Sequence, residues 1–232
     1  MKSASCGAGA LIALATMTAA SAEPSQRRWD GVYVGLSGGG GAGALDTKLL
    51  DDIGLLPPGS VIAQDQSGMV GGVHAGFNAT RGPWLLGIET AFGWTSIGGS
   101  GSRISIVDPD WTVHTKGETN WIASAVARLG FTSGNTLIYA KGGIAMTDMT
   151  LHGYSTMLGT YAGGGKIDRR FTGWTIGAGS EMALTGRWSI RLDYDYFDFG
   201  KERPNIGGTD IALTTQHHVG RVGISYALGG LR

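Results

Sequence analysis

Histidines have the broadest capacity for chemistry in this chain. The sequence contains five, His74, His114, His152, His217 and His218. A catalytic histidine works with a nucleophile or a carboxylate held within hydrogen-bond reach. His217 and His218 are adjacent, so in a strand they point to opposite faces and cannot share one metal ion or one base role. No serine lies in a nucleophile motif, and we therefore expect a protein that is not an enzyme.

Haem ligation is a second kind of chemistry to consider. His114, His152, Tyr154 and Tyr161 are residue types that ligate haem iron. Their spacing shows no tight ligand pattern, which favours polar surface residues over a ligand set. We expect no cofactor and no metal site, and keep His114 and His152 as the candidates if haem does bind.

A glycine pattern resembles a dinucleotide-binding loop. Gly38, Gly40 and Gly43 match G-x-G-x-x-G, and Asp65 follows at a suitable distance. A chain with 42 glycines satisfies such a pattern trivially. The prolines at 57 and 58 would also break the helix that the motif requires. We expect no nucleotide site here.

Eight segments alternate apolar residues with small or polar ones. Alternation with period two is typical of strands whose faces meet different solvents, and each segment is long enough to cross a bilayer. Three short turns and four long connections separate them. This pattern predicts an all-β fold, an eight-stranded antiparallel up-and-down transmembrane β-barrel with short periplasmic turns and long extracellular loops. The alternative is a soluble β-sandwich with buried tryptophans. The expected strands are 31–39, 68–79, 84–95, 118–131, 136–146, 171–184, 188–198 and 216–228, and the expected loops are 40–67, 96–117, 147–170 and 199–215.

Tryptophans support this topology, because amphipathic aromatic residues gather at the two membrane interfaces. Trp84 and Trp188 follow short turns, whereas Trp94, Trp121 and Trp174 adjoin long connections. We expect one aromatic girdle at each rim of the barrel.

Charged residues recur at the positions expected to face the lumen. An eight-stranded barrel is just wide enough to be filled by its own side chains, so acids and bases inside it should pair and block flow. Inward glycines leave room for the long arginines. The alternative is a charged filter in a narrow pore. The expected network is Glu89, Arg128, Lys141, Glu181, Arg191, Asp193, Asp195 and Arg221.

The first residues have the pattern of a cleaved secretory signal. Lys2 precedes an apolar run that ends in Ala20, Ser21 and Ala22. We expect a signal peptide over residues 1–22 and a barrel domain over 23–232. The one cysteine, Cys6, lies in the signal, so the exported chain would have no disulfide.

The first long connection mixes acids with apolar residues. Asp51 and Asp52 lie among Leu49, Ile53 and Leu55. A short amphipathic segment that contacts lipopolysaccharide or a host is one interpretation, and a mobile surface loop is the one we favour.

Several stretches resemble the small outer-membrane barrels of Gram-negative bacteria that are grouped as porin-like or opacity-like proteins, particularly the alphaproteobacterial ones. The matching stretches cover nearly the whole chain after the signal. They are WDGVYVG (29–35), NWIASAVARLG (120–130), LIYAKGGIA (137–145), GWTIGAGSEMAL (173–184), YDYFDFG (194–200) and VGRVGISY (219–226). The resemblance implies location in the cell outer membrane and a role as an envelope structural protein, surface antigen or haem binder.

These observations predict a monomeric barrel with a structural, envelope-integrity and surface-contact role and a lumen plugged by charged side chains. The alternatives are a narrow porin for small solutes and a haem-binding surface protein. The expected partners are outer-membrane lipid, lipopolysaccharide and the barrel assembly machinery. Basic and acidic residues balance at 18 each, so nothing indicates a nucleic-acid partner.

Overall fold

The computed structural model describes residues 29–203, 205–206 and 208–229. The expected signal peptide, 1–22, and Cys6 lie outside the described residues. No helix among the described residues is long and apolar enough to cross a bilayer. The described elements are the strands β1 (Gly31–Leu49), β2 (Val61–Arg81), β3 (Trp84–Thr95), β4 (Gly98–Ile104), β5 (Trp111–Ser133), β6 (Thr136–Met157), β7 (Thr160–Ala183), β8 (Trp188–Glu202), β9 (Asn205–Ile206) and β10 (Thr209–Gly229).

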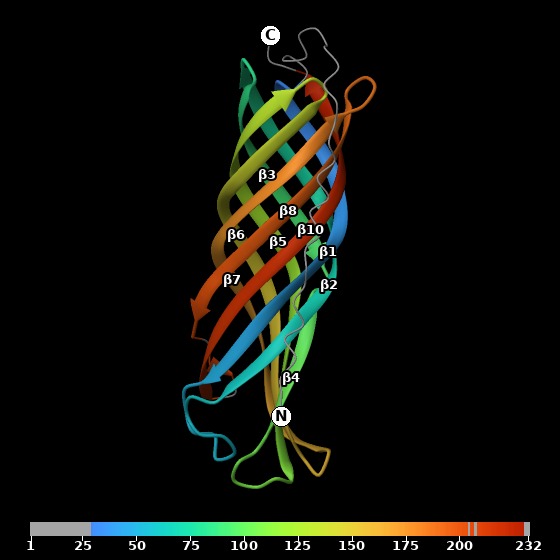
Figure 1. Cartoon of the computed structure of the whole chain (residues 1–232). Coiled ribbons are helices and arrows are strands. Elements are labelled where there is room, and N and C mark those ends of the chain that lie inside the picture. Colours follow the sequence, from blue (N-terminus) through green and yellow to red (C-terminus); the bar gives the residue numbers. More distant parts are fainter. Residues whose placement is uncertain (1–28, 204, 207, 230–232) are drawn as a thin grey trace, which may run out of the picture.

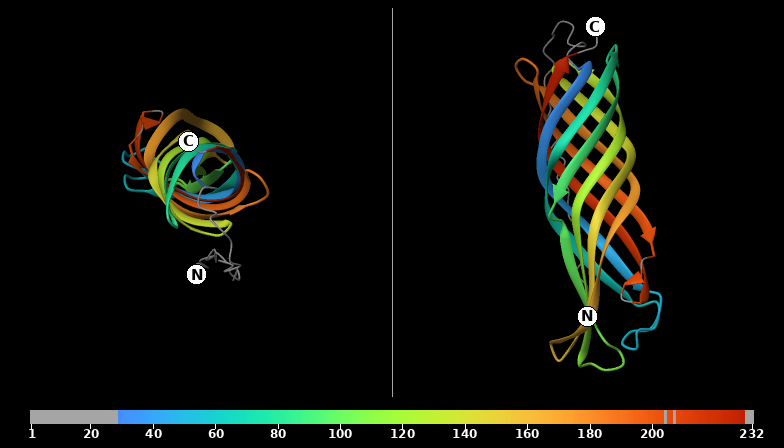
Figure 2. Two further views of the ribbon diagram at one scale, coloured as in Figure 1. Left: turned by 90° about the horizontal axis from the view of Figure 1, so that it is seen from above. Right: turned by 180° about the vertical axis from the view of Figure 1, so that it is seen from behind.

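The strands close into a ring in the order β1, β10, β8, β7, β6, β5, β3 and β2, and β2 pairs again with β1 (Figure 1). β4 follows β3 after a short break and, like β3, pairs with β2 on one side and β5 on the other. β9 forms a small hairpin with β10. Seen end-on, the ring encloses a single interior (Figure 2). The predicted all-β ring of eight antiparallel up-and-down strands is confirmed.

The three short turns lie together at one end of the barrel, uppermost in Figure 1. Gly82 and Gly134 adopt positive φ angles of 60° and 57° in two of them. Glycine permits this backbone conformation without a steric penalty, so both hairpins can turn tightly.

The connections at the other end are shorter than the sequence analysis expected. Strands continue through most of the four predicted loops, because β1, β2 and β5 to β7 have between 19 and 24 residues each. The connections that remain are 50–60, 105–110, 158–159 and 203–208, the last containing two residues outside the described set.

The expected loops were wrong because the alternation inverts instead of ending. In the first part of β1, Val34 and Leu36 point outward and are exposed. In its last part, Leu45 and Leu49 point inward and are buried, while the outward Asp46 is exposed. An apolar outside suits lipid and a polar outside suits water. The strands therefore cross the membrane and extend beyond it, and we call the outer part of the barrel the extension.

The outer surface of the membrane-crossing part is apolar on every side. Large exposed hydrophobic side chains on a water-soluble monomer would be a liability, whereas lipid acyl chains cover them without cost. Examples of these outward residues are Leu36, Met69, Leu86, Ile88, Ile138, Ile144, Ile176 and Leu192.

Tryptophans stand near both limits of this apolar surface. Trp84 and Trp188 begin β3 and β8 directly after short turns and are exposed. Trp94 and Trp121 are partners in the pairing of β3 with β5, and the exposed Trp174 pairs with Asp198. This placement supports the two predicted girdles.

The interior of the extension is an apolar core. Inward residues of β1, β2, β5 to β8 and β10 form one buried cluster, which includes Leu45, Met149 and Phe199. Leu56, from the connection 50–60, belongs to the same cluster at 1% exposure, and Leu55 packs against it. The expected mobile surface loop was therefore wrong: its leucines fill the barrel mouth.

Two neighbours fix this connection in place. The backbone N–H of Leu50 donates to the carbonyl of Asp210 at 2.9 Å, and Ser105 Oγ donates to the carbonyl of Leu55 at 2.8 Å. The connection is thus tied both to β10 and to the connection that follows β4.

Candidate functional site: the charged interior

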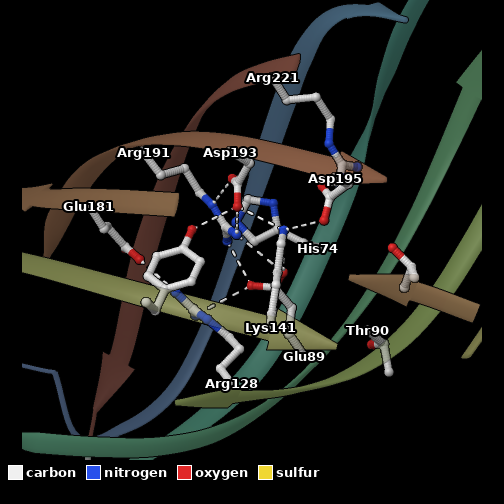
Figure 3. A network of polar contacts seen from close by, with 12 residues as sticks. His74, Glu89, Thr90, Arg128, Lys141, Glu181, Arg191, Asp193, Asp195 and Arg221 are labelled. Carbon is white, nitrogen blue, oxygen red and sulfur yellow. Dashed lines mark hydrogen bonds and ion pairs between the residues drawn. The ribbon is translucent and has the colours of Figure 1, made fainter. Parts of the chain in front are cut away.

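Eight charged side chains meet inside the membrane-crossing part of the barrel. They come from six different strands. Side chains alternate between the two faces of a strand, and each of these residues lies at a position that faces the lumen. All are buried except Arg221, which is partly buried. The structure brings together all eight residues of the predicted network: Glu89 on β3, Arg128 on β5, Lys141 on β6, Glu181 on β7, Arg191, Asp193 and Asp195 on β8, and Arg221 on β10 (Figure 3).

Arg191 binds two carboxylates at once. Its Nη1 and Nη2 donate to Glu89 Oε2 and Oε1 at 2.7 and 3.1 Å. Its Nε donates to Asp193 Oδ2 at 2.6 Å. β3 and β8 are opposite in the ring, with β10, β1 and β2 between them on one side and β7, β6 and β5 on the other. The Arg191 contact with Glu89 therefore crosses the whole lumen.

Arg128 is a second centre of the network and is fully buried. Its Nη1 lies 3.3 Å from Glu89 Oε2, and its Nη2 lies 3.3 Å from Glu181 Oε2. The guanidinium also stacks over the Tyr139 ring, with its carbon 3.9 Å from the ring centroid. A planar guanidinium offers several donors in fixed directions, which suits such a shared position.

Lys141 completes the network on the β8 side. Its Nζ lies 2.8 Å from Asp193 Oδ1 and 3.0 Å from Asp195 Oδ1. Arg221 of β10 forms an ion pair with the other oxygen of Asp195. Acids and bases thus alternate through the network, as charges buried away from water require.

Hydroxyl groups complete the network, and our sequence analysis did not single them out. Tyr33 Oη donates to Glu89 Oε2 at 2.8 Å and accepts a hydrogen bond from Arg128. Tyr139 Oη donates to Asp193 Oδ1 at 2.7 Å, and Ser189 Oγ donates to Glu181 Oε1 at 2.5 Å. The sequence does contain a pattern that could have identified them: like the charged residues, they lie at the alternate strand positions that face the lumen.

Inward glycines provide the space for these side chains. A Cβ on Gly177 would lie 2.5 Å from Asp195 Oδ1, and a Cβ on Gly179 would lie 2.6 Å from the Tyr139 ring. Both distances are shorter than non-bonded atoms tolerate. The glycine content of these strands is therefore tied to the bulky residues on their neighbours.

His74 lies beside the network and is paired with a serine. Its Nε2 lies 2.9 Å from Ser225 Oγ, and the two residues are 5% and 1% exposed. Both residues are buried, and the structure presents them as a hydrogen-bonded pair of the barrel interior. His217 is buried and His218 is exposed, as expected for neighbours in a strand.

The haem candidates lie on strands and not in loops. His114 on β5 stacks on Tyr154 of β6 with ring centroids 4.7 Å apart, and its Nε2 lies 3.0 Å from Thr156 Oγ1. His152 pairs in register with Lys116. Within the described residues no cluster of three or more His, Cys, Asp or Glu side chains is suited to a metal ion. Haem binding by His114 and His152 stays a hypothesis, which a haemin titration of the double alanine variant would test.

The glycine pattern at 38–43 has no phosphate-binding geometry. Gly38, Gly40 and Gly43 lie within β1, and their partners on both sides are strands. A dinucleotide loop must instead turn from a strand into a helix.

A closed antiparallel ring with an apolar outside, tryptophans at both limits and a self-paired charged inside defines an outer-membrane β-barrel protein. The family model described as "Outer membrane protein beta-barrel domain" matches residues 9–226, and the chain belongs to this family. The predicted family and the location in the outer membrane are confirmed.

Named relatives come from the alphaproteobacterial genera Brucella and Rhizobium. The chain is 29% identical over 207 residues to the 31 kDa outer-membrane immunogenic protein of Brucella melitensis, covering 85% of this chain and 83% of the relative. It is 25% identical over 171 residues to the 22 kDa outer membrane protein of Rhizobium leguminosarum, covering 74% and 64%. Among solved structures, the outer membrane protein OprG from Pseudomonas aeruginosa has a TM-score of 0.51 at 12% identity, covering 87% of this chain and 99% of that one. This likeness concerns the fold.

Proposed function

We propose that this protein is a closed wall element of the outer membrane, with a structural and surface-contact role and a lumen that does not conduct. The observation that carries the proposal is the bidentate contact of Arg191 with Glu89 on the opposite strand. Two side chains that together span the diameter of an eight-stranded barrel occupy the path that a solute would need.

The charges themselves favour a plug over a filter. A selective pore presents unpaired charge to passing ions. Here Glu89 has Arg128 and Arg191 as partners, and Asp193 has Lys141 and Arg191. The apolar core of the extension lies in series with the charged network and adds a second barrier, which ions cross poorly.

The extension supports the surface-contact role. Its outward face carries polar and charged residues, among them Lys116 and Glu118, whose side chains are 50% and 45% exposed. The Brucella relative is named an immunogenic protein. We infer that the extension of this chain is likewise the part that antibodies or surface partners reach.

The remaining partners follow from the same arrangement. The apolar belt meets outer-membrane lipid, and lipopolysaccharide surrounds the extension. The assembly machinery for outer-membrane barrels inserts the chain, which then acts as a monomer, because the ring has closed its own strand edges across the membrane.

Deletion of the gene tests the envelope role. We expect deletion to raise the sensitivity of cells to detergent, and expression of the wild-type chain to restore resistance. A matched complementation uses a variant with one exposed charge changed, Lys166→Ala, which should restore resistance equally. Unchanged sensitivity after deletion would contradict an envelope-integrity role.

A further inference from the structure

An apolar cavity of about 290 Å³ lies in the interior of the extension. Its wall includes side chains of the apolar core from β1, β2, β5, β6 and β10. The cavity is partly open to the outside, so it is a pocket at the barrel mouth that a small molecule can enter. The apolar wall is formed by Leu49, Ile62, Val113, Leu151, Ile211 and Leu213.

One polar side chain on this wall has an unused acceptor. Gln64 is 3% exposed and lines the cavity. Its Nε2 donates to Thr115 Oγ1 at 2.6 Å, whereas its Oε1 has no hydrogen-bond partner among the described residues. Buried carbonyl oxygens are normally paired, because an unpaired one loses its hydration without compensation. The oxygen is itself buried, so a ligand that donates one hydrogen bond would satisfy it after a rotation of the Gln64 amide toward the cavity.

The wall of the extension is incomplete beside the cavity. Between described residues, β7 pairs with β8 only from Trp174 to Ala183, although β7 begins at Thr160. Gly163, Gly164 and Gly165, in the part of β7 beyond this pairing, line the cavity. A rim without side chains leaves room for a small molecule to pass from outside, above the membrane.

We propose that this cavity binds a small uncharged molecule with an apolar ring or chain and one hydroxyl group. The apolar body lies against the Leu, Ile and Val side chains, and the polar group donates to Gln64 Oε1. The ligand is uncharged because the cavity wall is mainly apolar, and the ammonium of Lys116 is turned to the outward face, where it pairs with Glu118 at 2.6 Å. The charged network lies between the cavity and the short-turn end, so the site holds a ligand without passing it on. This proposal stands independently of the envelope role.

Two probes of the same shape test the site. 2-Naphthol carries a hydroxyl, and 2-methylnaphthalene replaces it with a methyl group. Calorimetric titration of the full chain in lipid nanodiscs, with empty nanodiscs subtracted, should show one saturable site. We expect 2-naphthol to bind about tenfold more tightly, since it pairs an otherwise unpaired buried oxygen. In Gln64→Leu this preference should vanish while 2-methylnaphthalene still binds.

A second variant fills the cavity. Val113→Trp places a bulky side chain in the void and should abolish binding of both probes. The matched control is Val107→Trp, because Val107 is 70% exposed in the connection 105–110 and does not line the cavity. It should bind both probes like the wild type. Heat-modifiable gel mobility confirms that each variant is folded. No saturable binding by the folded wild type, equal affinity for the two probes, or unchanged binding in folded Val113→Trp would overturn the proposal.

Discussion

The guanidinium of Arg191 reaches across the barrel to hold both carboxylate oxygens of Glu89, a residue on the opposite strand, at 2.7 and 3.1 Å. The two side chains are 2% and 3% exposed, so water cannot replace either partner. This pair joins two opposite sides of the wall, and in the proposed function it also closes the lumen at that point.

The strength of this pair can be measured by a double-mutant cycle. Glu89→Gln or Arg191→Met alone should lower the free energy of unfolding by about 3–5 kcal/mol, because each leaves a buried charge uncompensated. The double variant should lose less than the sum, with a coupling of about 1–3 kcal/mol. Urea unfolding in detergent micelles, followed by tryptophan fluorescence, gives these values.

An exposed pair serves as the control for that cycle. Lys166 and Asp168 are 3.8 Å apart with side chains 54% and 60% exposed. Their coupling should be below about 1 kcal/mol, since solvent screens exposed pairs. Equal coupling in the two cycles would contradict a special role for the buried contact.

Two glycines with opposite orientations should respond differently to a methyl group. A Cβ on Gly39 would lie 1.9 Å from the carbonyl oxygen of Gly220, whereas a Cβ on Gly220 meets nothing within 4 Å. Gly39→Ala should lower the free energy of unfolding by about 1–3 kcal/mol through overpacking. Gly220→Ala should change it by less than about 0.5 kcal/mol. The same urea titration measures both variants. Similar losses of unfolding free energy would show that the close approach of the backbone at Gly39 does not require glycine there.

The leucine at the barrel mouth should control protease access to the connection 50–60. Leu56→Asp would place a charge in an apolar site of 1% exposure and expel the connection from the core. We expect proteinase K to cut the variant faster than the wild type, with cleavage sites at 50–60 identified by mass spectrometry. Val107→Asp, at an exposed position, is the control and should leave these cuts unchanged. Equal cutting of Leu56→Asp and the wild type would show that Leu56 does not anchor the connection.

The orientation of the barrel can be tested with epitope tags at its two ends. A tag inserted between Leu158 and Gly159, at the tip of the extension, should be labelled by antibody on intact cells. A tag between Gly82 and Pro83, in a short turn, should be labelled only after the outer membrane is permeabilised. Both sites are two-residue connections between strands, so the two insertions are matched in their local structure. The reverse labelling pattern would invert the topology.

The charged network was predictable because strand parity is a local property. Once Glu89, Arg128 and Arg191 are placed on strands, the period of two assigns each to the lumen without knowledge of its partner. Strand order then makes pairing unavoidable in a narrow barrel. Which acid meets which base depends on register, and no local pattern encodes it.

The extension is not predictable from apolar outward residues, because these mark only the part of each strand that crosses the membrane. Beyond the girdle, the inward residues Met149 and Leu151 are the apolar ones, and their outward neighbours are polar. That inversion resembles a loop of mixed composition unless strand parity is followed through it. The packing of Leu56 into the mouth depends on tertiary contacts, so a mobile loop was the wrong interpretation.

Single-channel recording tests the closed lumen most directly. Purified monomer reconstituted into a planar lipid bilayer should give no stable conductance steps, while a general porin in the same lipid gives them. Folding of the reconstituted chain is verified by its heat-modifiable mobility. Stable, reproducible single-channel conductance from the folded wild-type monomer would contradict the plug and establish a narrow pore instead.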